Sequence, residues 1–323
     1  MAVIIVAAIA LAGVITIAVV TGGDSNIDDS AVDGGTSTTS TGSTTPTTAT
    51  TSEQTVPRST AAPIVDIVSR NVQMGLLQRQ YTTVAPLDMR ADERLPVVVA
   101  LHGLGQDRNT LLNAADWRGA VASDRFIAVF PQGVANSWNM GACCPPASLL
   151  GIDDLGFLDR VVSELTARPD VDPARLYITG FSNGGIMAYS EVCARPGVWA
   201  ALAPVSGSNL SGCSPSEPIS LLHQHGDPDP VVPFDGQPAL GQLLTSADLP
   251  SVPQSVAAWA AADGCPTPPR VDTEASSVER TIWAPCAAAT RVELVSLPGI
   301  GHAWPALGEY DGLQRMLEFF DLR

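Results

Sequence analysis

Residues 171–195 read VDPARLYITGFSNGGIMAYSEVCAR, and this stretch decides the fold of the chain. The apolar run LYIT at 176–179 predicts a buried strand, and residues 184–195 have the pattern of a helix. Between them lies the pattern Gly-x-Ser-x-Gly, formed by Gly180, Phe181, Ser182, Asn183 and Gly184. Glycine on either side of a serine allows a tight strand-to-helix turn that exposes a nucleophilic hydroxyl. The alternative is a Gly-rich turn in which Ser182 only caps the helix.

Apolar, β-rich runs and helical patterns alternate on both sides of this turn. Strands are expected at residues 95–101, 126–130, 201–205 and 219–223, and helices at residues 154–167 and 255–262. This alternation predicts an α/β fold with a mostly parallel sheet and helices on both faces. Ligands of such sheets bind beyond the carboxyl ends of the strands.

The first sixty residues differ in composition from the rest. Residues 2–20 are unbroken apolar sequence, which predicts a signal peptide or a membrane anchor at residues 1–20. No Lys or Arg precedes this run, so the sequence leaves both readings open. Twenty of the forty residues from 21 to 60 are Ser or Thr, which predicts a disordered linker. A single catalytic domain is expected at residues 61–323, secreted or tethered to the outer face of the membrane through residues 2–20.

The charge balance is acidic. Seventeen basic and 33 acidic residues give a formal net charge of −16 at pH 7. An acidic chain repels phosphate backbones, so nucleic acid is not expected as a partner, whereas neutral substrates meet no such barrier.

Six cysteines fall in the expected globular part, and their even number behind an apparent export segment favours disulfides. They are Cys143, Cys144, Cys193, Cys213, Cys265 and Cys286. Cys265 with Cys286 is the best single pair, because the two bracket one irregular Pro-rich stretch. A zinc site is the competing use of cysteine, but the sequence has no Cys-x-x-Cys pair and little His.

A serine nucleophile needs a base and an orienting acid. Of the four histidines, only His302 follows Ser182 with room for an acid and a strand between them, which is the chain order of Ser-acid-His hydrolases. The acid is expected in the segment LLHQHGDPDPVVP at 221–233, where spacing does not separate Asp227 from Asp229. Asp235 is a weaker third candidate.

Two backbone N–H groups are expected to stabilise a developing oxyanion. One is the N–H of Asn183, directly after the nucleophile. The other is the N–H of Leu104, in the Gly-containing turn HGLG at 102–105 that follows an expected strand.

A metal site is a rival interpretation of the same residues. His223, His225, Asp227 and Asp229 spell His-x-His-x-Asp-x-Asp, as in part of a metallo-β-lactamase zinc site. That site has His directly after the Asp, and Pro228 stands there in this chain. Its further ligands would have to be His102 and His302. We therefore expect no metal and no organic cofactor.

Six segments in register carry a wider resemblance: HGLGQ, SWNMGACC, IDDLGF, VDPARLYITGFSNGG, HGDPDPVVPFDG and GHAWP. With these, residues 65 to 320 resemble the extracellular polyhydroxybutyrate depolymerase and feruloyl esterase family, which has the α/β-hydrolase fold. The resemblance implies that Ser182 is the nucleophile, His302 the base and Asp229 the acid. Asp227 stands where the family has Thr.

The resemblance also suggests residues that contact the substrate. The family's SWN loop lies beside the mouth of the active site, which makes Trp138 and Asn139 candidates, and we group His102 with them. Trp304, next to His302, either lines the pocket or packs against its loop. Asp153 and Asp154 match the family's acidic pair at the start of a helix, where they cap the helix or bind substrate.

The sequence thus predicts a secreted serine carboxylic-ester hydrolase that forms an acyl-enzyme on hydroxyalkanoate or plant-polysaccharide esters. We expect it to act as a monomer on small or oligomeric esters. The alternatives are a serine peptidase of the same fold and a catalytically silent wall-associated binding protein.

Overall fold

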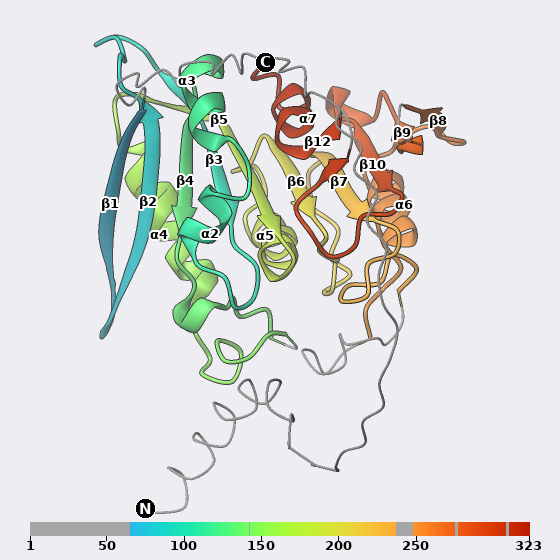
Figure 1. The fold of residues 1–323 in the computed structure, drawn as a ribbon, viewed down its shortest axis with the longest axis horizontal. Coiled ribbons are helices and arrows are strands. Elements are labelled where there is room, and N and C mark those ends of the chain that lie inside the picture. The colour runs from blue at the N-terminus through green and yellow to red at the C-terminus, as the bar shows by residue number, and fades with distance from the viewer. Residues whose placement is uncertain (1–64, 142, 237–247, 275–276, 308–309) are drawn as a thin grey trace, which may run out of the picture. The chain divides into compact units, whose positions relative to one another are not determined.

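The sheet at the centre of the computed structural model is mostly parallel (Figure 1). The structure describes residues 65–141, 143–236, 248–274, 277–307 and 310–323. The expected leader at 1–20 and linker at 21–60 lie outside these residues. Ten described strands pair in the order β1-β2-β4-β3-β5-β6-β7-β10-β9-β8. Their bounds are β1 (Val65–Met74), β2 (Leu77–Pro86), β3 (Leu95–Leu101), β4 (Ile127–Pro131), β5 (Val171–Phe181), β6 (Ala201–Val205), β7 (Ser220–Gly226), β8 (Arg270–Thr273), β9 (Glu279–Trp283) and β10 (Val292–Leu297). A separate two-stranded pair is formed by β11 (Ala306–Leu307) and β12 (Tyr310–Asp311).

The centre of the sheet is parallel and its two edges are antiparallel. Strands β4, β3, β5, β6, β7 and β10 run in one direction, whereas β1, β2, β8 and β9 join by antiparallel pairing. The strands predicted at 95–101 and 201–205 have those bounds in the structure. The predicted α/β-hydrolase fold class is confirmed.

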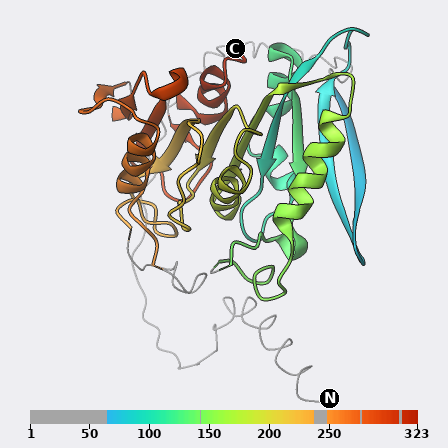
Figure 2. The same cartoon turned by 180° about the vertical axis from the view of Figure 1, so that it is seen from behind.

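Helices cover both faces of this sheet. On one face lie α4 (Asp154–Thr166), α5 (Asn183–Ala194) and α6 (Val252–Ala262), seen in front in Figure 2. The other face carries α2 (Arg108–Leu112), α3 (Trp117–Asp124) and α7 (Gly312–Phe319). Strand β3 supplies both layers, because Val97, Val99 and Leu101 pack under the first set of helices and Val98 and Ala100 under the second. The apolar run in this strand is therefore explained by burial on two faces.

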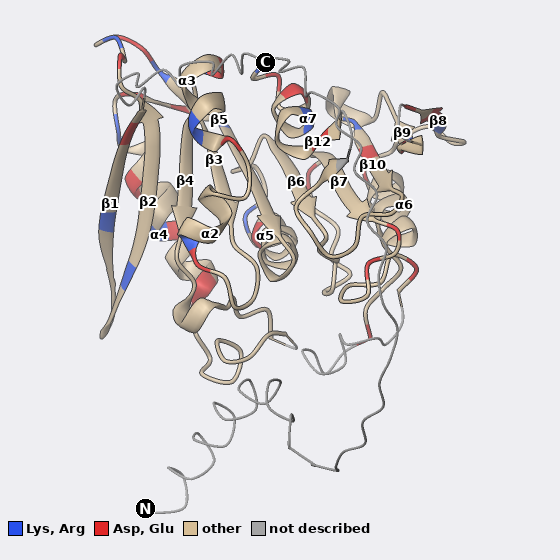
Figure 3. Cartoon of the chain, viewed as in Figure 1, with Lys and Arg blue, Asp and Glu red and all other residues tan. Residues whose placement is uncertain are grey.

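Several central strands carry no charged residue. Figure 3 shows β3, β4, β6 and β7 without any acidic or basic residue. Polar side chains instead start the helices: Asp153, for example, caps α4 by accepting a hydrogen bond from the Gly156 N–H at 2.8 Å. None of the helices in the described ranges combines the length and apolar composition needed to cross a bilayer.

The cysteines pair in three disulfides. The predicted Cys265–Cys286 bond is present and joins the end of α6 to the segment after β9. A second bond ties Cys193 in α5 to Cys213. The adjacent residues Cys143 and Cys144 form the third.

One carboxyl group on α5 is buried, although the nearby Arg195 favours its ionised form. Glu191 is fully buried, and neither of its carboxyl oxygens has a hydrogen-bond partner among the described residues. Burial raises its pKa from the ordinary 4.5 to about 7. Between these two values the folded protein holds a proton that the unfolded chain has lost. The stability of the protein therefore falls as pH rises through this window, by up to about 1.4 kcal/mol per pH unit.

Replacing Glu191 by Gln removes this titration, because the amide stays neutral. The free energy of unfolding of E191Q relative to the wild type should rise by roughly 1–3 kcal/mol between about pH 5 and about pH 8. Urea unfolding at the two pH values measures the difference. The exposed Glu217 offers the matched substitution, E217Q, which should show no such gain. An equal gain for both variants would contradict the assignment to Glu191.

Candidate active site

Ser182 occupies a strained turn between β5 and α5. Its φ of 56° and ψ of −118° lie outside the usual regions for a residue with a side chain. A Cβ on Gly180 would lie 2.3 Å from the Gly184 carbonyl carbon, and one on Gly184 would lie 2.1 Å from the Leu101 carbonyl oxygen. The two glycines are thus required for the close approach of α5 to β5 and β3. The Ser182 side chain makes no capping hydrogen bond, which excludes the reading of this serine as a helix cap.

Three side chains from separate segments meet at this turn. The Ser182 Oγ lies 2.8 Å from His302 Nε2, and His302 Nδ1 lies 2.7 Å from Asp229 Oδ2. His302 lies in the loop after β10, and Asp229 lies in the loop after β7. An imidazole in this position can accept the serine proton on one nitrogen while its other N–H donates to the carboxylate.

Asp229 is buried and held by several donors. Its Oδ1 accepts hydrogen bonds from the N–H groups of Val231 at 2.8 Å and Val232 at 2.9 Å. Burial acts to raise the pKa of the Asp229 carboxyl, but hydrogen bonds from His225 and His302 outweigh it. The pKa therefore lies well below its ordinary value, and Asp229 is a carboxylate at neutral pH.

The other two acid candidates are elsewhere. Asp227 is exposed, and its Oδ1 accepts a hydrogen bond from the Gly299 N–H at 3.3 Å. Asp235 is exposed as well. Of the two carboxylates that spacing did not separate, the structure brings Asp229 to His302.

The two N–H groups expected to stabilise the oxyanion lack a hydrogen-bond partner among the described residues, whereas neighbouring N–H groups have one. The Gly103 N–H donates to Gln106 Oε1 at 3.1 Å, and the Gly105 N–H donates to the Asn136 carbonyl at 2.8 Å. Among the described residues, neither the Leu104 N–H between them nor the Asn183 N–H at the start of α5 has a hydrogen-bond partner. Both groups are available to an oxygen of a ligand.

The structure corrects the expectation that His102 and Trp138 contact substrate. Both side chains are fully buried. His102 Nε2 accepts from the Gly133 N–H at 2.9 Å, and burial lowers the His102 pKa to about 4. The Trp138 indole N–H donates to the His102 carbonyl at 2.8 Å. These rings are parts of the framework because their polar atoms are already bonded inside the protein.

Trp138 also holds Asn183, the residue after Ser182. The backbone N–H of Trp138 donates to Asn183 Oδ1 at 2.8 Å, and Asn183 Nδ2 donates back to the Trp138 carbonyl at 3.2 Å. Through its indole and its backbone, Trp138 thus ties together the two segments that carry Leu104 and Asn183. Sequence reasoning found this residue but missed its role.

Asn139 and Trp304 are engaged within the protein too. Asn139 Nδ2 donates to the Ile152 carbonyl at 2.8 Å, and its Oδ1 accepts from the Gly141 N–H at 2.9 Å. The Trp304 ring lies 6.0 Å from the ring of Trp117 in α3 and packs against the core layer there. Of the two roles expected for Trp304, lining the pocket or packing within the protein, this contact corresponds to packing.

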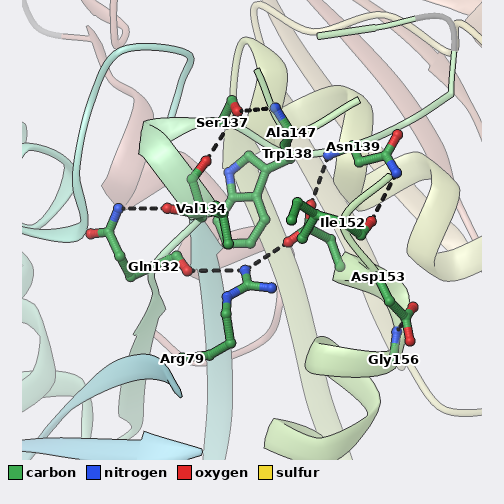
Figure 4. Close-up of polar contacts among 12 residues, drawn as sticks. Arg79, Gln132, Val134, Ser137, Trp138, Asn139, Ala147, Ile152, Asp153 and Gly156 are labelled. Carbon is green, nitrogen blue, oxygen red and sulfur yellow. Dashed lines mark hydrogen bonds and ion pairs between the residues drawn. The ribbon is translucent and has the colours of Figure 1, made fainter. Parts of the chain in front are cut away.

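A buried ion pair supports the loop that carries Trp138 and Asn139 (Figure 4). Arg79 Nη2 lies 2.6 Å from Asp154 Oδ1 and 3.1 Å from the Gln132 carbonyl oxygen. Asp154 Oδ2 accepts from the Asn139 N–H at 2.8 Å. Of the acidic pair in the sequence, Asp153 caps α4 and Asp154 anchors this loop. Arg79 lies in β2, which the sequence patterns did not predict, and it was therefore missed.

The His-x-His pair forms hydrogen bonds within the core. His223 and His225 are bonded to each other, to Tyr189 and to the Val232 carbonyl. No cluster of three or more His, Cys, Asp or Glu side chains suited to a metal occurs in the described ranges.

Comparison with known proteins gives relatives named as esterases, although no family model matches the sequence. The chain is 27% identical to feruloyl esterase B of Piromyces equi over 230 residues, which are 68% of this chain and 41% of the relative. It is 32% identical to the putative esterase NocK of Nocardia uniformis subsp. tsuyamanensis over 237 residues, which are 66% of each. The chain therefore spans less than two thirds of the length of these curated relatives.

A solved structure matches the fold. The acetyl xylan esterase from Aspergillus awamori superposes with a TM-score of 0.57 at 14% identity, covering 79% of this chain and 100% of that one. At this identity the match concerns the fold alone. The fold match and the two sequence relatives agree with the strand–serine–helix turn at Ser182: the chain has the α/β-hydrolase fold and is similar in sequence to esterases of the feruloyl esterase type.

Proposed function

We propose that this protein is a secreted serine esterase that hydrolyses carboxylic esters of plant polysaccharides through an acyl-enzyme. The observation that carries the proposal is the position of His302, whose ring nitrogens lie 2.8 Å from Ser182 Oγ and 2.7 Å from Asp229 Oδ2. This geometry suits a base that removes the serine proton while a buried carboxylate fixes its tautomer.

The reaction follows from these contacts. Ser182 Oγ attacks the ester carbonyl carbon as His302 Nε2 takes its proton, and the N–H groups of Leu104 and Asn183 stabilise the oxyanion. The tetrahedral intermediate collapses as His302 gives the proton to the leaving alcohol. Water, deprotonated by His302, then attacks the acyl-enzyme, and His302 returns the proton to Ser182 Oγ as the acid is released. Asp229 remains ionised and stabilises the imidazolium that forms in each step.

The choice of substrate rests on the relatives. A feruloyl esterase and an acetyl xylan esterase are among the matched proteins, which supports ester groups on plant polysaccharides over hydroxyalkanoate polyesters. The disulfides and the apolar run at 2–20 support an extracellular location. Because neutral esters carry no charge, the net charge of −16 does not oppose substrate binding.

The test is turnover by the full chain on methyl ferulate, acetylated xylan, a short-chain aryl ester, 3-hydroxybutyrate oligomers and a matched amide. Replacing Ser182 by Ala removes the nucleophile, so ester hydrolysis should fall by about 10⁴-fold or more. S190A, which removes a hydroxyl from the same helix, should keep its activity. Turnover by S182A would refute the mechanism, preference for the amide would indicate a peptidase, and an inert wild type would indicate a binding protein.

The acid is tested by a matched pair of substitutions in one loop. In D229N the amide does not stabilise the His302 imidazolium or select its tautomer, so kcat should fall by about 10⁴-fold. Asp227 lies two residues away and does not contact His302, so D227N should change kcat less than about threefold. Steady-state kinetics on the aryl ester measure both variants. A larger loss for D227N would move the acid to that position.

A substitution at Trp138 tests whether this residue holds together the two segments that carry the Leu104 and Asn183 N–H groups. W138F keeps an aromatic ring, although a smaller one, and removes the indole N–H, leaving the His102 carbonyl without this donor. We expect kcat to fall about tenfold with KM nearly unchanged. W259F is the control, because Trp259 is also buried and donates its indole N–H to a carbonyl, that of Ile219. A rise in KM without loss of kcat would instead make Trp138 a substrate contact.

A further inference from the structure

A buried chain of hydrogen bonds runs from helix α5 through strand β7 to Asp229. The Tyr189 hydroxyl lies 2.7 Å from His223 Nδ1, and His223 Nε2 lies 3.0 Å from His225 Nδ1. His225 Nε2 lies 2.8 Å from the Val232 carbonyl oxygen and 3.4 Å from Asp229 Oδ2. All of these side chains are buried. The catalytic mechanism above does not use this chain.

The direction of every hydrogen bond follows from its last member. The Val232 carbonyl can only accept, so His225 Nε2 carries the proton and His225 Nδ1 is an acceptor. His223 must then donate from Nε2, which leaves its Nδ1 to accept from the Tyr189 hydroxyl. In the reversed arrangement, the Nε2 lone pair of His225 would face the Val232 carbonyl oxygen and the Asp229 carboxylate, which is repulsive.

Two members of the hydrogen-bond chain, Tyr189 and His223, are neutral. Burial lowers the pKa of His223 well below its ordinary value and raises the pKa of Tyr189. Neither side chain therefore ionises near neutral pH. All donors in the chain point toward Asp229, so their dipoles present positive potential to its carboxylate.

His225 acts on both halves of the Asp229 carboxylate. Its Nε2–H is directed at the Val232 carbonyl and also faces Oδ2, the oxygen that accepts from His302 at 2.7 Å. Val232, whose carbonyl it holds, donates its own N–H to Oδ1 at 2.9 Å. Among the described residues, the titratable groups that contact Asp229 are thus His225 from β7 and His302 from the loop after β10.

We propose that His225, held in one tautomer by His223 and Tyr189, is a positioning residue that orients the Asp229 carboxylate toward His302 and limits its basicity. The inference rests on the proposed esterase mechanism. Without the His225 N–H, the negative charge on Asp229 is less dispersed, and the carboxylate attracts the imidazolium form of His302 more strongly. His302 then loses its proton at higher pH and acts less effectively as a base at a given acidic pH.

The experiment compares pH profiles of kcat/KM for the full chain on the aryl ester. In H225L we expect kcat/KM at neutral pH to fall about tenfold and the acid limb of the profile to move up by about half a pH unit or more. H225Q keeps an N–H donor and should lie between H225L and the wild type. Y189F removes the hydrogen bond from the Tyr189 hydroxyl to His223 Nδ1 and should shift the acid limb in the same direction by a smaller amount.

A matched control removes a hydroxyl from the opposite side of β7. The Tyr310 hydroxyl donates to Gln224 Oε1 at 2.7 Å, the same distance as the Tyr189–His223 bond. Gln224 lies between the two histidines in β7. Y310F therefore loses a part-buried hydrogen bond of the same length without changing the chain from Tyr189 to Asp229, and its acid limb should coincide with that of the wild type.

The tautomers give a readout that does not depend on activity. Long-range ¹H–¹⁵N correlation spectra should show both His223 and His225 neutral, with the proton on Nε2, at neutral pH. Finding Nδ1–H on either ring, or an imidazolium, would overturn the proposal. The spectra also apply to Y189F if the His225 variants do not fold.

The outcomes separate this inference from the proposed function. If the wild type lacks ester turnover or S182A retains it, the esterase mechanism itself fails. If turnover depends on Ser182 but Y189F and the folded His225 variants keep the wild-type acid limb, only the positioning role is overturned. An equal shift in Y310F would also overturn it, because the effect would then follow from any lost hydrogen bond in β7.

Discussion

The close approach of helix α5 to strands β5 and β3 is the constraint on which the active site depends. A Cβ on Gly184 would lie 2.1 Å from the Leu101 carbonyl oxygen, so a side chain there would displace the helix. This contact sets the start of α5 directly against the sheet and leaves Ser182 at a φ of 56°. The cost of that conformation is balanced by the burial of both faces of the central strands. The strained residue is thus held by the most rigid part of the fold.

Buried hydrogen bonds fix the positions of the active-site groups, because hydrogen bonds are directional and apolar contacts are much less so. Trp138 joins the carbonyl of His102 to the side chain of Asn183, and the pair of Arg79 and Asp154 anchors the loop behind it. An ion pair of this kind adds little net stability, since desolvation offsets most of the attraction. Its value lies in fixing one arrangement, because either charge alone would be buried without compensation.

Sequence patterns predicted the central strands and the Ser182 turn because both have strong local signals. They missed the hairpin of β1 and β2, because β1 is a largely exposed edge strand of mixed polar sequence and β2, although mostly buried, carries polar residues. They also missed β10, where Glu293 interrupts the apolar run; the structure shows that it is buried against Arg280 and Arg315, partners that no local pattern reveals. Spacing left the acid undecided between two carboxylates of one loop, since only tertiary structure decides which of them faces His302.

The dipole of helix α5 has opposite effects on negative charge at the two ends of the helix. The amide groups at its N-terminus, including the Asn183 N–H, carry the positive pole of the helix dipole, which favours a developing oxyanion there. The negative pole falls on the last turn, close to Glu191, where an ionised carboxylate would be opposed by both desolvation and the dipole. Burial already raises the Glu191 pKa to about 7, so this carboxyl group is uncharged in acid. One helix therefore stabilises negative charge beside Ser182 and disfavours it two turns further on.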